Sequence, residues 1–204
     1  MFDHFSKEKP DFLMKKDKSR KGCIDKDAVK IVNEINSKKD FYTTSSCSGR
    51  IVLLEMKSKR KDECSWILTK HNKVKLNEIK NSLKKYIKNS PITKINNKIK
   101  NNQKNQIWFK QQPLILHVAC RNLDAAKRLL DAARKVFKHS GIISINEKKI
   151  VVEIIGNERI ETIIADKNFA ADENYIKNLV KYANDNFEEN KKKSVRFLKI
   201  LKSL

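Results

Sequence analysis

The sequence predicts an α+β fold, a single domain over residues 1–204 in which helices flank a mixed, largely antiparallel sheet. Three observations support this prediction. At 204 residues the chain is long enough to bury one sizeable core. Short segments rich in β-branched and aromatic residues alternate with segments whose apolar residues recur every three or four positions. In the second half, three strand-like segments follow one another, which is incompatible with a purely alternating βαβ chain.

The first half of the chain shows helical spacing in two segments and strand composition in three. The expected elements, in chain order, are a helix at 24–38, strands at 40–46, 50–56 and 65–71, and a helix at 74–88. Asp25 precedes the first helix and is a candidate N-cap, with its carboxylate facing free backbone N–H groups. Residues 47–49 carry a turn signal between the first two strands, and His71 ends the third strand.

The second half begins with two strands that Pro113 separates or bends. The expected elements are strands at 106–110 and 114–121, a helix at 122–137, strands at 140–145, 149–155 and 159–165, and a C-terminal helix, in one piece or two, at 172–204. Asn122 is a candidate N-cap of the helix that follows it. Residues 94–105, rich in lysine and asparagine, are expected to form a flexible basic loop.

The formal net charge of +22 is the strongest compositional signal. Such a charge points to a polyanionic partner, and nucleic acid comes first. A coding bias towards lysine and asparagine is the alternative explanation, because it would raise the charge without selecting for binding. The densest basic block runs from Lys70 to Lys110, with 12 lysines and one acid, Glu78.

The apolar segments are short, and none reaches the roughly 18 residues that a membrane-spanning helix needs. The N-terminus, "MFDHFSKEKPDF", lacks the apolar centre of a signal peptide. We therefore expect a cytoplasmic protein with no membrane partner.

The four cysteines are scattered, and no C-x-x-C pair occurs. This pattern argues against a zinc ribbon, so no metal is expected. The alternative is a metal site that uses His117 and Cys120 in "LHVAC" as a ligand pair. Cys47 can also be read as a nucleophile with His71 or His117 as its base. A small residue that fills a tight turn is the simpler interpretation of Cys47.

Glycine is scarce, with four residues in the whole chain. A dinucleotide-binding or Rossmann loop needs clustered glycines, and a P-loop needs G-x-x-x-x-G-K-[ST]. Neither pattern occurs, nor does G-x-S-x-G. These absences argue against a Rossmann-type enzyme, a P-loop enzyme and an α/β-hydrolase.

Polar residues gather instead at the ends of predicted elements, in "DKSRKGCID", "TTSSCSGR", "HVACR" and "HSGI". Side chains at strand ends on a rigid sheet commonly form ligand sites, although turns alone also require Ser, Thr and Gly. Arg50, beside Gly49, favours a ligand site, because the donor fork of a guanidinium suits a phosphate or carboxylate.

Taken in order, these clusters resemble the tRNA wybutosine-synthesising protein 3 family. The matching pieces are "SRKGCID", "FYTTSSCSGRIVLLE", "WILTKH", "LILHVACRNLDAAKRLLDAA", "SGI" and "ENYIKNLVKYANDNFEENKKKSVRFL". They run from about residue 17 to about residue 198, and "TTSSCSGR" is the most specific of them.

The resemblance implies an S-adenosylmethionine-dependent methyltransferase that is not of the Rossmann type. Such an enzyme methylates N4 of 7-aminocarboxypropyl-demethylwyosine, next to the anticodon of phenylalanine tRNA. The candidate proton acceptors are Asp25, His71 and His117, unranked. The residues expected to bind cofactor or substrate are Ser19, Lys21, Gly22, Thr44, Ser45, Ser46, Cys47, Ser48, Gly49, Arg50, Arg121, Ser140 and Gly141.

Two readings stay open beside this one. A non-catalytic basic RNA-binding module is the main alternative, but aromatic residues make up only 7% and mostly occupy periodic, core-like positions. A cysteine-dependent hydrolase that uses Cys47 is the weaker one. Arg50 can hold the carboxylate of the cofactor, the carboxylate of the substrate or a tRNA phosphate.

Overall fold

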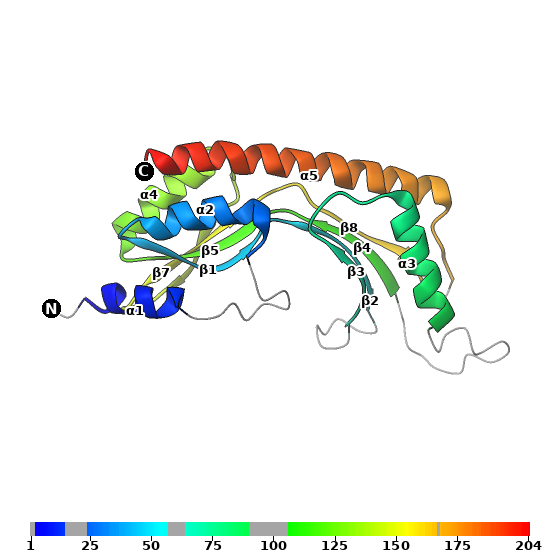
Figure 1. The fold of residues 1–204 in the computed structure, drawn as a ribbon, viewed down its shortest axis with the longest axis horizontal. Helices are drawn as coiled ribbons and strands as arrows, with labels where there is room; N and C mark the ends of the chain where they lie inside the picture. The colour runs from blue at the N-terminus through cyan, green and yellow to red at the C-terminus, as the bar shows by residue number, and fades with distance from the viewer. Residues whose placement is uncertain (1–2, 15–23, 57–63, 90–105, 167) are drawn as a thin grey trace. The chain divides into compact units, whose positions relative to one another are not determined.

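A computed structural model describes residues 3–14, 24–56, 64–89, 106–166 and 168–204 (Figure 1). Backbone contacts divide the chain into two compact units. Unit 1 comprises Met1–Gly49, Pro113–Asn157 and Glu188–Leu204, and unit 2 comprises Arg50–Gln112 and Glu158–Phe187. Each unit has a sheet and a hydrophobic core of its own. The assignment of the whole chain to one domain stays a prediction.

The sheet of unit 1, sheet A, has the strand order β1-β5-β7-β6, and all its pairings are antiparallel. Its strands are β1 (Phe41–Cys47), β5 (Ile115–Cys120), β6 (Gly141–Ile145) and β7 (Ile150–Ile155). Burial alternates strictly along β7, so one face of this strand lies in the core and the other is half-buried.

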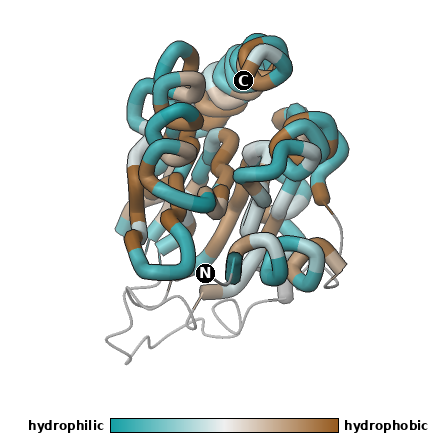
Figure 2. The backbone as a smooth tube through the Cα atoms, turned by 90° about the vertical axis from the view of Figure 1, so that its left-hand side faces the viewer, coloured by the Kyte–Doolittle hydropathy of each residue, from teal (hydrophilic) through white to brown (hydrophobic). Residues whose placement is uncertain are grey.

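One face of sheet A is covered by α2 (Lys26–Ser37), α4 (Leu123–Arg134) and the last turns of α5 (Glu173–Lys202). The core beneath them includes Ile31 and Phe197, and Figure 2 shows hydrophobic and hydrophilic residues alternating along the helices. The predicted N-cap of α4 is confirmed, because the Asn122 side chain accepts a hydrogen bond from the backbone N–H of Ala125.

The opposite face of sheet A carries α1 (His4–Leu13), a helix that the sequence analysis missed (Figure 1). Pro10 lies inside this helix, where a proline disfavours helical structure. Packing against sheet A stabilises the helix: Phe5 is buried against Tyr42 with a ring-centroid distance of 5.1 Å, and Ala119 completes this small cluster. Tertiary contact thus stabilises a helix whose own sequence is unfavourable.

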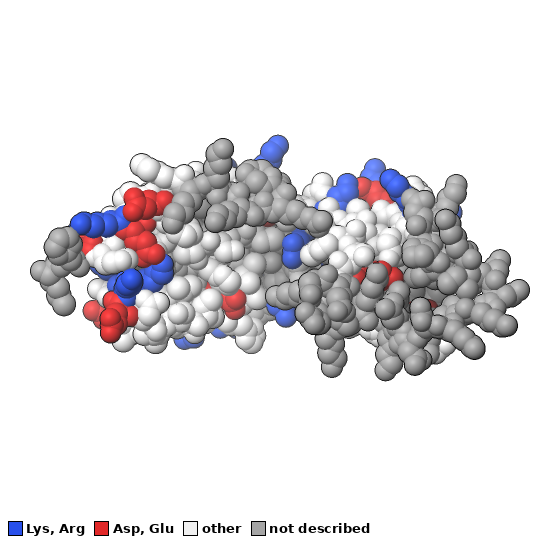
Figure 3. Space-filling view, turned by 90° about the horizontal axis from the view of Figure 1, so that it is seen from below, with Lys and Arg blue, Asp and Glu red and all other residues white. Residues whose placement is uncertain are grey.

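Ion pairs between α1 and sheet A add to this packing. Arg121, directly after β5, is hydrogen-bonded to the carboxylate of Asp3 and, at 2.9 Å, to that of Asp40. Asp40 also accepts from Arg128 at 2.8 Å. Figure 3 shows interleaved acidic and basic side chains in the region of α1.

Acidification is expected to release α1 from sheet A. The pKa of Asp3 is lowered to about 2, first by a hydrogen bond from Ser6 and further by Arg121. Burial alone would raise the pKa of Asp40, but hydrogen bonds from Arg121 and Arg128 outweigh it and hold that pKa below its usual value. A depressed carboxyl pKa stabilises the folded state above the ordinary value, and this contribution is lost as the pH falls through the folded value. The protection factors of the α1 amides, which correct for the intrinsic pH dependence of exchange, should therefore fall between about pH 4 and pH 2.

The matched variant is Arg121→Ala, which removes the shared partner of both carboxylates. Its α1 amides should exchange faster at neutral pH and show a weaker response to acid. An unchanged acid response in Arg121→Ala would contradict the assignment.

The sheet of unit 2, sheet B, has the order β3-β2-β4-β8 and is also antiparallel throughout. Its strands are β2 (Arg50–Met56), β3 (Cys64–Lys70), β4 (Gln106–Gln112) and β8 (Ile160–Ala165). One face packs against α3 (Leu76–Asn89) and the first turns of α5, with Leu53, Phe109, Ile79 and Val180 in the core.

The predicted α+β class and the antiparallel pairing are confirmed, and the described strands form no parallel Rossmann-type sheet. The strands form two sheets where one was expected. The ladder of sheet A ends at the pair Cys47 and Ile115, and that of sheet B ends at Arg50 and Gln112. Gly49 has a φ of 102°, and proline has no N–H to donate, so neither Gly49 nor Pro113 suits a continuous ladder.

The C-terminal region is a single helix of 30 residues. Within the described part of the chain, every helix is too short or too polar to span a bilayer. The predicted basic loop at 94–105 lies outside the described residues.

Candidate functional site

The end of β1 is held by a buried carboxylate. Asp25 occupies the N-cap position of α2, but its side chain makes no capping hydrogen bond there. Its Oδ2 instead accepts from the backbone N–H of Ser48 at 3.0 Å and from the Ser48 hydroxyl at 3.2 Å. The two residues are only 6% and 5% exposed. The predicted capping role of the carboxylate is therefore wrong: Asp25 fixes the turn that follows β1.

A second buried side chain, Asn190 on α5, completes this turn and was missed from sequence. Its Nδ2 donates to the carbonyl oxygen of Ser48 at 2.8 Å, and its Oδ1 accepts from the N–H of Leu114 at 2.8 Å. Asn190 is 2% exposed. Where the ladder of sheet A ends, these side chains satisfy backbone groups that strand pairing no longer satisfies.

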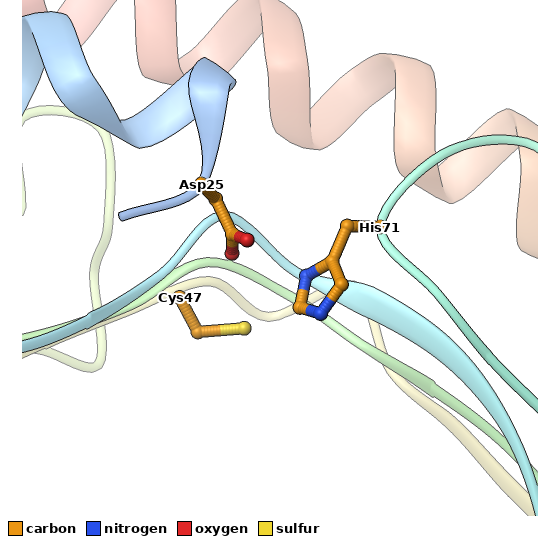
Figure 4. A group of neighbouring side chains, drawn as sticks. All are labelled: Asp25, Cys47 and His71. Carbon is orange, nitrogen blue, oxygen red and sulfur yellow. The ribbon is translucent and has the colours of Figure 1, made fainter. Parts of the chain in front are cut away.

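Cys47, the last residue of β1, is half-buried beside this turn, and Figure 4 shows its side chain together with that of Asp25. Its Sγ and a carboxylate oxygen of Asp25 lie within 4.8 Å of each other. His71, also drawn in Figure 4, belongs to unit 2, where it directly follows β3.

A row of polar residues crosses the face of sheet A that carries α1. Cross-strand pairing places Ser45 opposite His117, His117 opposite Glu153, and Glu153 opposite Gly141. Directly opposed residues project from the same face of a sheet. The structure thus brings together three residues that the sequence analysis singled out, from three different strands.

Glu153 is the member of this row that the sequence analysis missed. Its Oε2 lies 2.9 Å from Nε2 of the His117 ring, and both side chains are half-buried. The available signal was a lone acid in the otherwise apolar strand "IVVEII". An ionised carboxylate can only accept a hydrogen bond, so Nε2 must donate, and the neutral ring then carries its lone pair on Nδ1.

His117 and Cys120 do not form a ligand pair. Three positions apart on a strand, they project to opposite faces, and Cys120 lies in the core beneath the helices. Burial raises the pKa of the Cys120 thiol to about 12, so the thiolate that a metal requires is strongly disfavoured.

Two other predicted residues lie apart from the row or serve local structure. Arg121 lies near Phe41, at the far end of β1 from Cys47, because Phe41 pairs with Cys120. The two ends of β1 are about 20 Å apart along the strand. Ser140 is buried and caps the turn after α4, since its hydroxyl donates to the carbonyl oxygen of Phe137 at 2.8 Å.

Arg50 begins β2 in unit 2 and is held by two contacts. Its Nε donates to Oε1 of Gln112 at 2.6 Å, and its guanidinium carbon lies 5.1 Å from the centroid of the Trp66 ring. Of the remaining candidates, Thr44 donates its hydroxyl to the carbonyl oxygen of His117 at 3.2 Å. Ser19, Lys21 and Gly22 lie outside the described residues.

Comparison with known proteins accounts for this combination of motif and fold. Residues 6–203 match the family model described as Methyltransferase TYW3. The chain belongs to the TYW3 methyltransferase family. The suspected resemblance is thereby confirmed.

Curated relatives and solved structures agree with this assignment to the TYW3 family. A tRNA(Phe) 7-((3-amino-3-carboxypropyl)-4-demethylwyosine(37)-N(4))-methyltransferase of Archaeoglobus fulgidus is 34% identical over 207 residues, covering 100% of this chain and 95% of that protein. The tRNA wybutosine-synthesizing protein 3 homolog of Mus musculus is 33% identical over 203 residues, covering 97% of this chain and 72% of that protein. The structure of the PH1069 protein from Pyrococcus horikoshii aligns with a TM-score of 0.79 at 31% identity, covering 97% of this chain and 98% of that one.

Membership of the TYW3 family makes the protein a methyltransferase. A methyltransferase acting on a ring nitrogen that bears a proton needs an acceptor for it. The pair of His117 and Glu153 is a candidate for this role.

Proposed function

We propose that the protein transfers a methyl group from S-adenosylmethionine to N4 of 7-aminocarboxypropyl-demethylwyosine in phenylalanine tRNA. The relatives named above support the substrate, and the net charge of +22 suits an RNA polyanion. The family membership favours this enzyme over a non-catalytic RNA-binding module and over a cysteine-dependent hydrolase.

The structural observation that carries the proposal is the pair of His117 and Glu153 on sheet A. Of the three candidate proton acceptors, Asp25 is buried and already accepts two hydrogen bonds from Ser48. His71 belongs to unit 2, where it directly follows β3. His117 is half-buried, its Nε2 lies 2.9 Å from Oε2 of Glu153, and Ser45 lies directly opposite. We assign proton acceptance to Nδ1 of His117.

The cofactor, when bound, would supply a sulfonium methyl group: the ring nitrogen bonds to the methyl carbon, and the carbon–sulfur bond breaks with its electron pair left on the thioether sulfur. The polar row suits such a ligand chemically, because the hydroxyl of Ser45 can donate to a carboxylate or accept from a ribose hydroxyl. The turn held by Asp25 and Asn190 positions the residues around Cys47. In this proposal the chain aligns the acceptor nitrogen, the methyl group and the sulfur, and removes one proton.

Methyl-labelled S-adenosylmethionine and tRNA from cells that lack the last wybutosine steps provide the test. We expect label on the tricyclic base of the anticodon loop, with a mass increase of one methyl group after nuclease digestion. A phenylalanine tRNA transcript with unmodified guanosine is the matched control and should receive no label. Binding of the modified tRNA without any transfer would refute the proposed activity.

A further inference from the structure

The outer face of sheet B, which faces away from the core of unit 2, carries both tryptophans of the chain in one cross-strand row. Leu54 on β2 pairs with Trp66 on β3 and with Trp108 on β4. Opposed residues project from the same face, so the two indoles flank Leu54. With adjacent strands 4.7–4.9 Å apart, their backbones are separated by about 10 Å. We call Trp66, Leu54 and Trp108 the tryptophan row.

This face lies opposite to the core of unit 2. The neighbouring positions Leu53 and Phe109 pair with each other and lie in the core with residues of α3 and α5. Side chains alternate along a strand, so the tryptophan row projects away from these helices. Trp66 is 43% exposed, and Trp108 is half-buried. Among the described residues no helix packs on this side of sheet B.

A cationic side chain lies within cation–π distance of each indole of the row. The guanidinium carbon of Arg50 lies 5.1 Å from the Trp66 ring centroid, and Nζ of Lys110 lies 4.9 Å from the Trp108 ring centroid. Both cations are also tied in place, Arg50 by Gln112 at 2.6 Å and Lys110 by Glu161 at 3.3 Å. The surface therefore combines flat aromatic area with fixed positive charge.

We propose that the tryptophan row, with Arg50 and Lys110, is a stacking platform for unpaired nucleobases of RNA. Successive bases stack on aromatic rings and on guanidinium planes in proteins that bind single strands. Positive charge beside the rings attracts the phosphates that accompany the bases. The face is thus complementary to a polyanion that carries planar groups. The identity of the biological ligand, the unpaired bases of the tRNA anticodon loop, rests on the proposed function.

The proposal also gives Arg50 a ligand class. Its guanidinium carbon lies 5.1 Å from the Trp66 ring centroid while its Nε donates to Gln112, which leaves the remaining guanidinium donors for a base or a phosphate. The sequence analysis placed aromatic residues mostly in the core and so disfavoured RNA stacking. The exposed Trp66 departs from that expectation, because the strand periodicity that buries alternate residues also exposes those between them.

Because the chain has no other tryptophan, its intrinsic fluorescence reports on this platform directly. A single-stranded oligoribonucleotide with the anticodon-loop sequence should quench the emission of the full-length protein, and a duplex RNA of the same length should bind without comparable quenching. Trp66→Ala should weaken single-strand binding about 5- to 150-fold, as expected for one lost base–aromatic stack. Trp66→Phe, which keeps a ring, should retain most of the affinity.

Tyr182→Ala is the matched control, since Tyr182 is also an exposed aromatic residue of unit 2, 59% exposed, with Nζ of Lys181 6.0 Å from its ring centroid. It lies on α5 and should leave binding within about twofold, as for a surface substitution. Equal losses in Trp66→Ala and Tyr182→Ala, or equal quenching by single strand and duplex, would overturn the proposal. The proposal would also be overturned if RNA left the tryptophan emission unchanged and Trp66→Ala sedimented at a lower mass than the wild-type protein. That result would indicate that the tryptophan row contacts a second copy of the chain.

The binding assay contains no S-adenosylmethionine, which separates this inference from the proposed function. Quenching by the single strand without any methyl transfer would leave the platform intact and refute the enzyme activity. Methyl transfer at normal rate and affinity in a folded Trp66→Ala protein would refute the platform alone. Circular dichroism of each variant establishes the folded state before binding is compared.

Discussion

Replacing His117 by alanine is expected to lower kcat for methyl transfer by about 10²- to 10⁴-fold, the range typical of a lost general base. The affinity for tRNA should change by less than about threefold, because neutral imidazole contributes little to polyanion binding. Single-turnover transfer of labelled methyl groups, with tRNA affinity measured in parallel, checks both values. A folded His117→Ala protein with an unchanged rate would remove His117 from the chemistry.

The stronger test of the same arrangement is Glu153→Gln. A glutamine amide can donate to Nε2, which favours the tautomer with the proton on Nδ1 and so removes the lone pair there. We expect kcat to fall with little change in KM, and ¹⁵N NMR of the imidazole should show the tautomer exchanged. Glu173→Gln is the matched control, because Glu173 pairs with Lys80 on the surface of unit 2 and should leave both readouts unchanged.

Asp25→Ala is expected to be the most destabilising single substitution at the candidate site, lowering the free energy of unfolding by about 3 kcal/mol. The change leaves two buried donors of Ser48 without their acceptor, and buried unsatisfied donors are costly. Asp25→Asn retains an acceptor oxygen and should lose about half as much. Denaturant unfolding monitored by circular dichroism measures all three proteins.

Asp27→Ala is the matched control for this prediction. Asp27 lies in the first turn of the same helix but is exposed, and its nearest cationic partner, Lys191, is 3.9 Å away. Surface ion pairs of this kind contribute about 0–1 kcal/mol, so stability should barely change. Equal losses in Asp25→Ala and Asp27→Ala would show that the Ser48 contacts contribute nothing specific.

Local sequence signals predicted many of the elements well. The helix beginning after Asp25, the strand predicted at 40–46 and observed at Phe41–Cys47, and the Asn122 cap all depend on interactions within a few residues, and each is confirmed. The helix α1 was not predicted from such local signals. Pro10 weakens it locally, while the buried Phe5 stabilises it through contact with Tyr42.

The candidate site was predicted only in part, for a physical reason. The sequence identified Ser45, His117 and Gly141 as polar residues at element ends, yet it contained no information on the register that places them in one row. It passed over Glu153, whose role arises from a partner 36 positions away, and Asn190, which meets Ser48 across 142 positions. It grouped Arg121 with the motif, although antiparallel pairing carries Arg121 to the far end of β1.

The sequence by itself determined the family through its motif "TTSSCSGR" and the α+β class through its periodicities. Each of these depends on residue type and short spacing, which a linear chain displays. Only the tertiary structure decided that Asp25 holds a turn, that Glu153 lies beside His117, and that both tryptophans share one face of sheet B. These features depend on strand register and on contacts between distant segments, which arise only when the chain buries its apolar surface and pairs its backbone.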